Sequence, residues 1–304
     1  MNVWLAYFCL ALAMAIVGAY VGFSKALVIV FPIFLLAWMR FAIAAVAMAP
    51  WLRRPAGEAP LDAPAHRLVF LESFFGNFLF SICMLFGMKQ SSALAAGVIM
   101  AAIPAMVAIL SWLILDERVS LRGAAGIACA IAGIALVSLA KDDEGERIGS
   151  LSGNLLLVGA MTCEAIYVVI GKKLAARIGP KRISALINLW GLALVTPFAI
   201  WQFPAFQFKF IDSSYWGLLV LYSIGASIVT VWLWMTGLKR VPASSAGVFT
   251  VFLPVSAAAI GVWVYGETLN AWQLGAMALA LAGVVLAAWP ARRAAPIAEW
   301  PAPT

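Results

Sequence analysis

Long runs of apolar residues alternate along the chain with short polar breaks. A helix needs ~20 mostly apolar residues to cross a bilayer, because each residue rises ~1.5 Å across ~30 Å of hydrocarbon. The breaks contain turn-forming and charged residues, as in Arg53-Arg54-Pro55 and Gly179-Pro180-Lys181. The pattern predicts an all-α polytopic membrane protein with ten transmembrane helices, at residues 3–23, 31–51, 68–88, 93–115, 121–140, 153–171, 182–202, 215–238, 243–265 and 271–290.

Composition excludes several other classes of protein. Of the 304 residues, 65% are hydrophobic and 11% charged, whereas soluble domains are nearer ~45–50% and ~25%. A soluble globular protein and a disordered chain are therefore excluded. Nucleic-acid binding is not expected either, because the basic residues lie in short clusters between apolar runs and form no basic face. The apolar runs are continuous rather than alternating, which excludes an outer-membrane barrel.

The distribution of Lys and Arg predicts the orientation, because these residues are retained in cytoplasmic loops. With a cytoplasmic N-terminus and ten spans, the inside loops hold fourteen of the twenty basic residues and the outside loops hold five. Arg40 lies within a span and completes the count. Both termini are therefore expected in the cytoplasm. No basic residue precedes the first span, so a cleaved signal peptide is not expected.

The sequence matches itself when it is shifted by 150 residues. Gly87 then falls on Gly237, Pro104 on Pro254, and Glu117 on Glu267. Each half contains five spans, and because five is odd, the second half must enter the membrane in the opposite orientation. Such inverted repeats are typical of secondary transporters, although an old duplication without a transport role would leave the same pattern. The predicted units are a first repeat, a periplasmic linker, a second repeat and a cytoplasmic tail, at residues 1–140, 141–152, 153–290 and 291–304.

One motif occurs in both halves. An Ala-Gly pair is followed by a proline, then by an acidic residue that ends the span, then by a Gly-rich span that ends in Ala-Gly. The copies begin at Ala95 and Ser245 and reach Glu117 and Glu267. In these features the chain resembles the EamA-type family of the drug/metabolite transporter superfamily, and within it is similar to bacterial aromatic amino-acid exporters. The resemblance implies two inverted five-helix repeats in a bacterial inner membrane, and export of small metabolites, above all aromatic or hydrophobic amino acids.

Matched polar residues predict a substrate site. Ser73, Asn77 and Ser81 recur every four residues and would share one face of an α-helix. The 150-residue shift places Ser73 on Ser223 and Asn77 on Ser227, with Trp234 nearby. The two faces are expected to line one cavity near the middle of the membrane. The alternative is that these side chains bond helices together, as small polar residues do in membranes.

Charged residues within spans are the sharpest candidates for function. Glu164 lies in the middle of the sixth span, with Tyr167 one turn later. Because a carboxylate in hydrocarbon is costly, Glu164 should face the interior, as a proton-coupling group or as a counter-ion for a substrate ammonium. The alternative is a structural pair with Arg40. Arg40 itself would either neutralise a carboxylate or extend towards the interface, and Glu72 is expected near the headgroups.

Glycine and proline mark candidate hinges in the fourth and ninth spans. Gly97 with Pro104 and Gly247 with Pro254 occupy matched positions. Proline removes a backbone hydrogen bond and kinks a helix. The kinks would permit the bending that alternating access requires, or would be static bends that shape the cavity.

The acidic residues after these spans are expected to mark helix boundaries. Glu117 precedes Ser120 and Glu267 precedes Asn270, and both Ser120 and Asn270 are suitable N-caps for the next helix. Asn270 with Gln273 resembles a capping box.

An enzyme is not expected. His66 is the one histidine, and it lies in a loop. The chain has no hydrolase, zinc or nucleotide-binding motif, so no cofactor or metal is expected. The expected partners are a small-molecule substrate and the lipid bilayer, with no nucleic acid, in a monomer or homodimer. The alternative function is a multidrug exporter of lipophilic cations, for which Glu164 would be the counter-charge.

Overall fold

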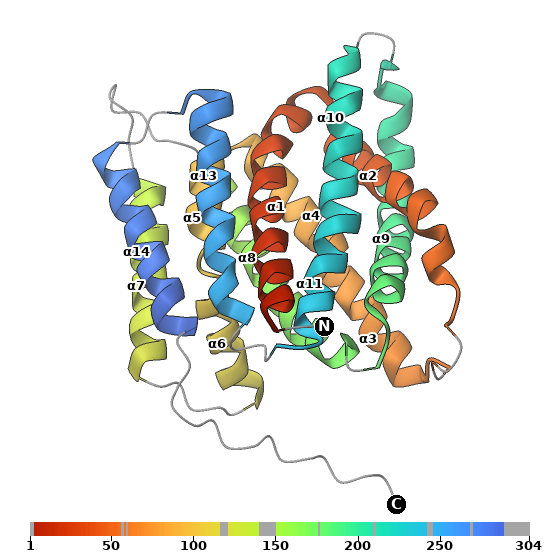
Figure 1. Ribbon diagram of the computed structural model, residues 1–304. Helices are drawn as coiled ribbons and strands as arrows, with labels where there is room; N and C mark the ends of the chain where they lie inside the picture. Colours follow the sequence, from red (N-terminus) through yellow and green to blue (C-terminus); the bar gives the residue numbers. More distant parts are fainter. Residues whose placement is uncertain are drawn as a thin grey trace, which may run out of the picture.

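The computed structural model describes residues 3–55, 58, 60–115, 121–139, 150–175, 177–208, 211–241, 246–267 and 270–288. All regular structure in these residues is helical (Figure 1). The first half contains α1 (Val3–Val30), α2 (Ile33–Met48), η1 (Ala49–Leu52), α3 (Ala63–Ser73), η2 (Phe74–Leu79), α4 (Phe80–Lys89), α5 (Ala93–Met100), α6 (Ile103–Leu115) and α7 (Leu121–Leu139). The second half contains α8 (Leu151–Ala175), α9 (Pro180–Gln202), η3 (Phe203–Ala205), α10 (Ser213–Ser223), η5 (Ile224–Val229), α11 (Thr230–Leu238), η6 (Gly247–Val251), α13 (Phe252–Tyr265) and α14 (Ala271–Ala288).

Apolar helices occupy each of the ten segments that the hydrophobic pattern indicates. Six helical stretches are long and apolar enough to cross a membrane: Val3–Val30, Ile33–Leu52, Ala63–Lys89, Leu151–Ala175, Pro180–Ala205 and Ser213–Leu238. Four shorter apolar helices lie at Ala95–Leu110, Gly123–Leu136, Phe249–Tyr265 and Ala271–Gly283. The chain is therefore a multi-pass membrane protein. Glu117, residues 141–149 of the linker and the tail 291–304 lie outside the described residues.

Irregular helical segments recur at the 150-residue interval. The segments η2 and η5 are both π-helical and occupy residues 74–79 and 224–229. The helix that contains Pro104 is interrupted between α5 and α6, and the helix that contains Pro254 begins with the 3₁₀ segment η6. Proline cannot donate a hydrogen bond to the carbonyl four residues earlier, which explains why each break precedes its proline. The matched Gly and Pro positions therefore interrupt their helices in this structure.

Helix N-termini are capped by side chains at equivalent places in the two halves. Asp62 accepts a hydrogen bond from the backbone N–H of Ala65 at the start of α3, and Asp212 accepts one from Ser214 at the start of α10. The hydrogen bonds from Ser214 hold the pKa of Asp212 below its ordinary value. The predicted capping box is confirmed, because the side chains of Asn270 and Gln273 each accept a hydrogen bond from the other's backbone N–H.

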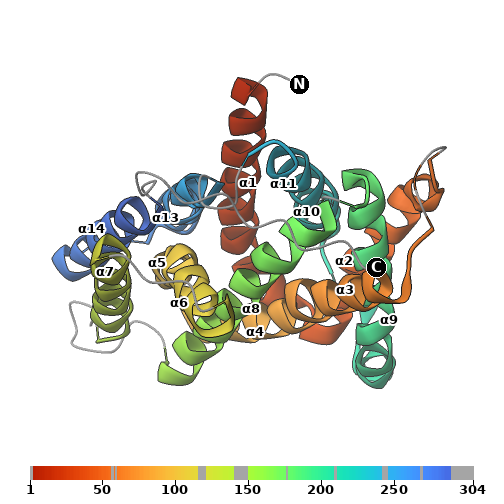
Figure 2. The same ribbon diagram turned by 90° about the horizontal axis from the view of Figure 1, so that it is seen from below.

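The helices form one elongated bundle. The pair α7 and α14 packs together at one end, and α2, α3 and α9 lie at the other, as both views show (Figures 1 and 2). Between the two ends, α1 packs against α11 and α13, while α8 packs against α4 and α6. The four helices α1, α4, α8 and α11 thus form the middle of the bundle, where the buried apolar side chains join into one core.

Glycines bring helix backbones close together around α13. A Cβ atom on Gly18 of α1 would overlap the carbonyl oxygen of Leu253 and the hydroxyl of Ser256. A Cβ on Gly97 of α5 would lie 3.1 Å from the Cβ of Ala257. Small residues at helix contacts increase van der Waals packing, which drives helix association in lipid. Gly18 and Gly97 therefore set the positions of α1 and α5 on α13.

Ion pairs join the two halves at opposite edges of the bundle. Near the start of α3, which lies at the lower edge in Figure 1, Glu58 pairs with Arg182, and Asp62 lies 3.4 Å from Arg177. At the upper edge, Lys25 Nζ lies 2.5 Å from Glu267 Oε1. Glu267 lies two residues after the end of α13, as the helix-boundary prediction expects, but it also bonds across to α1. Contacts between sequence-distant segments therefore join the two halves at both the upper and the lower edge of the bundle.

We predict that Gly18→Ala lowers the midpoint of thermal unfolding in detergent. Overpacking of a tight contact costs about 1–3 kcal/mol, and the carbonyl of Leu253 is backbone and cannot rotate away. Gly217→Ala is the matched control, because Gly217 also lies in a helix but its Cβ would meet nothing within 4 Å. Both changes gain the same helix propensity, so equal midpoints for the two variants would contradict the close approach at Gly18.

Candidate functional site

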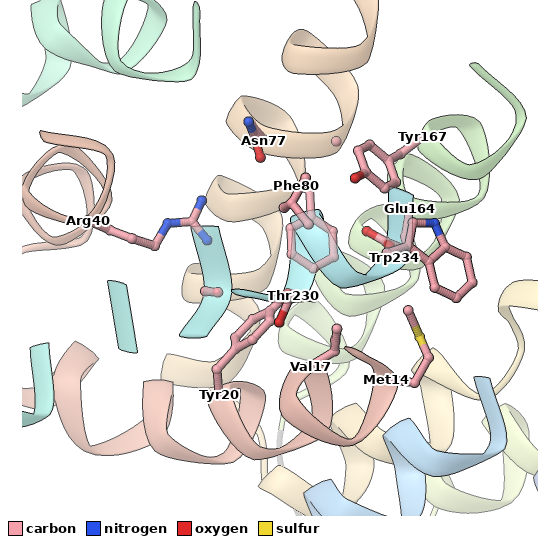
Figure 3. A pocket seen from close by; sticks show the side chains of 13 residues that line it. Met14, Val17, Tyr20, Arg40, Asn77, Phe80, Glu164, Tyr167, Thr230 and Trp234 are labelled. Carbon is pink, nitrogen blue, oxygen red and sulfur yellow. The ribbon is translucent and has the colours of Figure 1, made fainter. Parts of the chain in front are cut away.

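A small cavity lies in the middle of the bundle, between α1, α2, α4, α8 and α11 (Figure 3). Its volume is about 30 Å³, which is space for about two water molecules. An organic substrate would need this space to widen. The cavity is lined by Met14, Val17, Tyr20, Arg40, Gly76, Asn77, Phe80, Glu164, Tyr167, Ala226, Thr230, Val231 and Trp234.

Glu164 projects from α8 into the cavity. Its side chain makes no hydrogen bond or ion pair with any residue that the structure describes. In particular, the structural pair with Arg40 that the sequence left open does not form. An ionised carboxylate in the apolar part of a membrane protein is costly unless it is paired or hydrated. Glu164 is therefore a polar group that is available to a ligand.

Arg40 reaches the cavity from α2, on the side opposite Glu164 (Figure 3). The residue is only 3% exposed, so the alternative that it extends to the interface is wrong. Its guanidinium Nη2 donates a hydrogen bond of 2.6 Å to Ser81 Oγ, and the guanidinium carbon lies 4.3 Å from the ring centre of Phe41. The guanidinium Nε is buried without a partner. Within the described part of the chain no carboxylate pairs with Arg40.

Aromatic side chains and two unpartnered polar atoms complete the cavity wall. Tyr20, Phe80, Tyr167 and Trp234 approach it from four different helices. The indole N–H of Trp234 and the hydroxyl of Thr230 are both buried without a hydrogen-bond partner. Buried polar groups are normally satisfied, so these two atoms are free to bond a ligand. The cavity wall thus offers groups that suit both the charged and the aromatic parts of a ligand.

Only one of the serine and asparagine residues that were predicted to line the cavity does so in the structure. Asn77 lines the cavity, and Ser81 lies behind it, donating to the Asn77 carbonyl while it accepts from Arg40. Ser73 donates instead to the carbonyl of Ile187 on α9 at 2.5 Å, and Ser223 donates to Leu219 within α10. Ser73 and Ser223 therefore bond backbone carbonyls, which was the alternative interpretation.

Ser227 is buried as well but is not among the residues that line the cavity. The π-helical segments explain why the residues of each matched polar face do not all point into the cavity. Residues four apart lie above one another in an α-helix, whereas a π-helix bonds residues five apart. The segments η2 and η5 therefore rotate the residues that follow them relative to Ser73 and Ser223.

Several lining residues were not candidates in the sequence. Tyr20, Phe80, Met14 and Val17 are ordinary apolar or aromatic residues of long spans, and nothing in their spacing distinguishes them from packed side chains. Thr230 had a weak signal, because it follows the matched pair Ser223 and Ser227. Arg40, by contrast, was already a candidate, as the one basic residue deep within a span.

The expected position of Glu72 near the headgroups is wrong. The sequence places it near the headgroups, a few residues into the third span, but its exposed fraction is 0%. The reason is that α3 begins at Ala63, five residues before the predicted span, so Glu72 lies more than two turns into the helix. It faces Gly171 of α8 rather than solvent or lipid headgroups.

The candidate hinges meet each other across the bundle. A Cβ on Gly97 would lie 3.3 Å from the Cα of Pro254, so α5 packs directly on the proline of α13. Pro104 lies in α6 and Gly247 begins η6. These interruptions lie beside α1, whose Met14, Val17 and Tyr20 line the cavity. Bending at them would change the wall that α1 provides.

Among the described residues, no three His, Cys, Asp or Glu side chains come together in a group that could hold a metal ion. Cys9 and Cys163 are buried and Cys83 and Cys129 are partly buried, and all four are free thiols.

The sequence matches the model of the EamA-like transporter family twice, over residues 4–139 and 151–289. The uncharacterized transporter YetK of Bacillus subtilis is 32% identical over 255 residues, which are 83% of this chain and 77% of the relative. The uncharacterized transporter YyaM of the same organism is 25% identical over 213 residues, 70% of each chain. A crystal structure aligns with a TM-score of 0.62 at 18% identity, covering 93% of this chain and 95% of that one, and shows a shared fold.

The family match covers both halves of the helical bundle, and the relatives named above are transporters. These findings agree with a central cavity lined by charged and aromatic groups in a multi-pass membrane protein. The chain belongs to the EamA-like transporter family.

Proposed function

We propose that this protein is a secondary transporter of a bacterial inner membrane that exports aromatic and large apolar amino acids by alternating access. The observation that carries the proposal is the pair of Arg40 and Glu164. The two side chains reach one cavity from opposite sides, and neither pairs with a charge among the described residues. A zwitterion brings both missing counter-charges in one molecule.

The cavity suggests how an amino acid would be held. Arg40 would bind the substrate carboxylate through its guanidinium, whose orientation Ser81 fixes. Glu164 would bind the ammonium group, and Trp234 and Thr230 would donate their unpartnered hydrogen bonds. The aromatic walls provide an apolar surface for the substrate side chain, and ring pairs gain energy beyond their buried area. The aromatic walls would thus select the size of the substrate side chain, while Arg40 and Glu164 would select the charged groups of the substrate.

The proposed topology is ten transmembrane helices in two inverted five-helix repeats. Three features support it: the double family match, the π segments at residues 74–79 and 224–229, and the equivalent caps at Asp62 and Asp212. The bias of Lys and Arg supports a cytoplasmic location for both termini and for the lower edge of Figure 1. Inverted repeats place a substrate site at their interface near the midplane, and a cavity in the middle of the bundle agrees with such a site.

Alternating access would open the two edges in turn. The cavity is much smaller than an amino acid, and ion pairs join the halves at both edges. Opening towards the periplasm would separate Lys25 from Glu267, and opening towards the cytoplasm would separate Glu58 from Arg182. The helix breaks near Pro104 and Pro254 are suited to the accompanying bends. The proposed partners are the small-molecule substrate and the bilayer, with no nucleic acid, and the protein would act as a monomer or homodimer.

The second candidate is a multidrug exporter of lipophilic cations. The observation that favours it is the unpaired Glu164 among aromatic rings, because an aromatic wall and one carboxylate suit an organic cation. The presence of Arg40 disfavours a lipophilic cation as the substrate. A buried guanidinium in the same cavity would repel a cation and would remain without a counter-ion.

Competition in liposomes tests the substrate class. The purified protein is reconstituted and loaded with labelled L-phenylalanine, and unlabelled L-tryptophan, L-leucine, ethidium or glucose is added. We expect tryptophan and leucine to compete and glucose to have no effect. If no amino acid is carried, the proposed substrate class is wrong, and competition by ethidium together with ethidium transport would favour the second candidate.

We predict that Arg40→Gln weakens phenylalanine binding at least 30-fold. Removing one partner of a buried charge pair costs about 2–5 kcal/mol, and 1.4 kcal/mol corresponds to a tenfold change in affinity. Arg177→Gln is the control, because Arg177 is an exposed arginine at the lower edge. Equilibrium binding to the detergent-solubilised protein provides the measurement. Unchanged affinity in Arg40→Gln would remove the carboxylate-binding role of Arg40.

We predict that Glu164→Gln also weakens phenylalanine binding, through the loss of the counter-charge for the ammonium group. Phenyllactate, which has a hydroxyl in place of the ammonium, separates the two ends of the site. Arg40→Gln should reduce its binding, whereas Glu164→Gln should not. The assignment of Glu164 to the ammonium group fails if both variants lose phenylalanine and phenyllactate to the same extent.

A further inference from the structure

Glu72 is a second carboxyl in the interior of the bundle, outside the cavity. It lies on α3 with an exposed fraction of 0%. Its Oε1 is 2.7 Å from the place that a Cβ on Gly171 would occupy, and the methyl group of Met235 lies beside the same glycine. Both carboxyl oxygens are buried without a hydrogen-bond partner. No ion pair reaches Glu72 from the residues in the described ranges.

Such a group requires a small positive partner that adds no bulk. An isolated carboxylate in an apolar interior costs far more than protein stability allows, so a buried carboxyl without a partner is neutralised instead. A metal cation would need several oxygen ligands, and no cluster of three candidate ligands exists among the described residues. A proton needs only the carboxyl itself.

A line of contacts joins Glu72 to the cavity along the seam between the third span and α8. Glu72 faces Gly171, and one turn later a Cβ on Gly76 would overlap the ring of Tyr167. One further turn leads to Phe80 and Glu164, which both line the cavity. Seven residues separate Gly171 from Glu164 along α8, which corresponds to ~10 Å. Along α8, Tyr167 lies between Gly171 and Glu164.

The direction of this line is set by the helices that form it. The first residue of α3 and the last residue of α8 lie towards the lower edge of Figure 1, where Asp62 and Arg177 meet. Glu72 therefore lies between the cavity and the edge that the basic loops assign to the cytoplasm.

We propose that Glu72 is a proton-binding site that couples export to the inward movement of a proton. This proposal rests on the proposed function. Glu164 takes up a proton from the periplasmic side when the substrate ammonium leaves it. The proton then passes by way of the Tyr167 hydroxyl to the Glu72 carboxylate, and Glu164 is ionised again. Glu72 releases the proton to the cytoplasm, so one substrate leaves and one proton enters in each cycle.

The other groups around Glu72 leave the proton with these two carboxyls. The segments packed against α3 are η2, α8 and α9. Besides Glu164 and Tyr167, the helix α8 carries Cys163, Lys172 and Lys173, and Lys173 is exposed. The segment η2 carries no titratable side chain. The charged residues of α9 are Lys181 and Arg182, which lie at its start against Trp51 and Glu58.

Infrared spectroscopy of the reconstituted protein tests the proton site without any substrate. At neutral pH we expect the carbonyl absorption of protonated carboxylic acids, with a component that is lost in Glu72→Gln and remains in Glu164→Gln. Glu58→Gln is the matched control, because Glu58 is a part-buried glutamate that is paired with Arg182. Carbonyl absorption that is absent from the wild type, or that is unchanged in Glu72→Gln, overturns the proposal. If Glu72→Gln does not fold, Glu164→Gln decides, since loss of this absorption there overturns the proposal too.

Transport against a pH gradient tests the coupling. Proteoliposomes are held at zero membrane potential with a pH difference of one unit, and phenylalanine accumulation is measured. A stoichiometry of one proton to one substrate predicts tenfold accumulation by the wild type. Glu72→Gln should bind phenylalanine and exchange it for unlabelled phenylalanine, but should accumulate none. Accumulation by Glu72→Gln equal to that of the wild type overturns the proposal.

The two proposals can fail separately. A wild-type protein that neither binds nor exchanges amino acids contradicts the proposed function, while the infrared band still decides whether Glu72 carries a proton. A protein that exchanges phenylalanine but shows no Glu72-dependent band retains the proposed function and loses the proton site.

Discussion

Charge without a partner in an apolar interior is the constraint on which the central part of this structure depends. The bundle is built almost entirely from apolar helices, yet Arg40, Glu72 and Glu164 are placed in its middle. None of them forms an ion pair with another described residue. Each therefore depends on something that the chain does not supply by itself. We assign a substrate carboxylate to Arg40, a substrate ammonium to Glu164 and a proton to Glu72.

The rest of the fold brings these groups to their positions and allows them to move. Close contacts at Gly18 and Gly97 hold α1 and α5 on α13, so the wall of the cavity is fixed by backbone packing. The π segments η2 and η5 break the regular face periodicity on both sides of the cavity. Such irregular helical turns occur often at functional sites. Ion pairs at the two edges close the bundle, and these exposed or part-buried contacts separate more easily than the core.

The helical architecture was predictable because bilayer thickness imposes a length on every span. Each of the ten apolar runs corresponds to a helical stretch, and the capping box at Asn270 was visible in four residues. The lining of the cavity was less predictable. The π segments separate Ser73 from Asn77 despite their spacing, and no short sequence signal marks a π segment. Glu72 was misplaced because its helix begins before the apolar run. Tyr20 and Phe80 resemble packing residues, and only the three-dimensional arrangement shows their role.

An experimental structure with bound L-tryptophan is the most direct test of the central claim that this cavity binds a zwitterion. We expect the cavity to be enlarged around one tryptophan molecule, with its carboxylate on the Arg40 guanidinium and its ammonium on the Glu164 carboxylate. The indole ring should lie among Tyr20, Phe80, Tyr167 and Trp234. Tryptophan bound elsewhere, or bound in the cavity with neither charged side chain within hydrogen-bond distance, would contradict the claim.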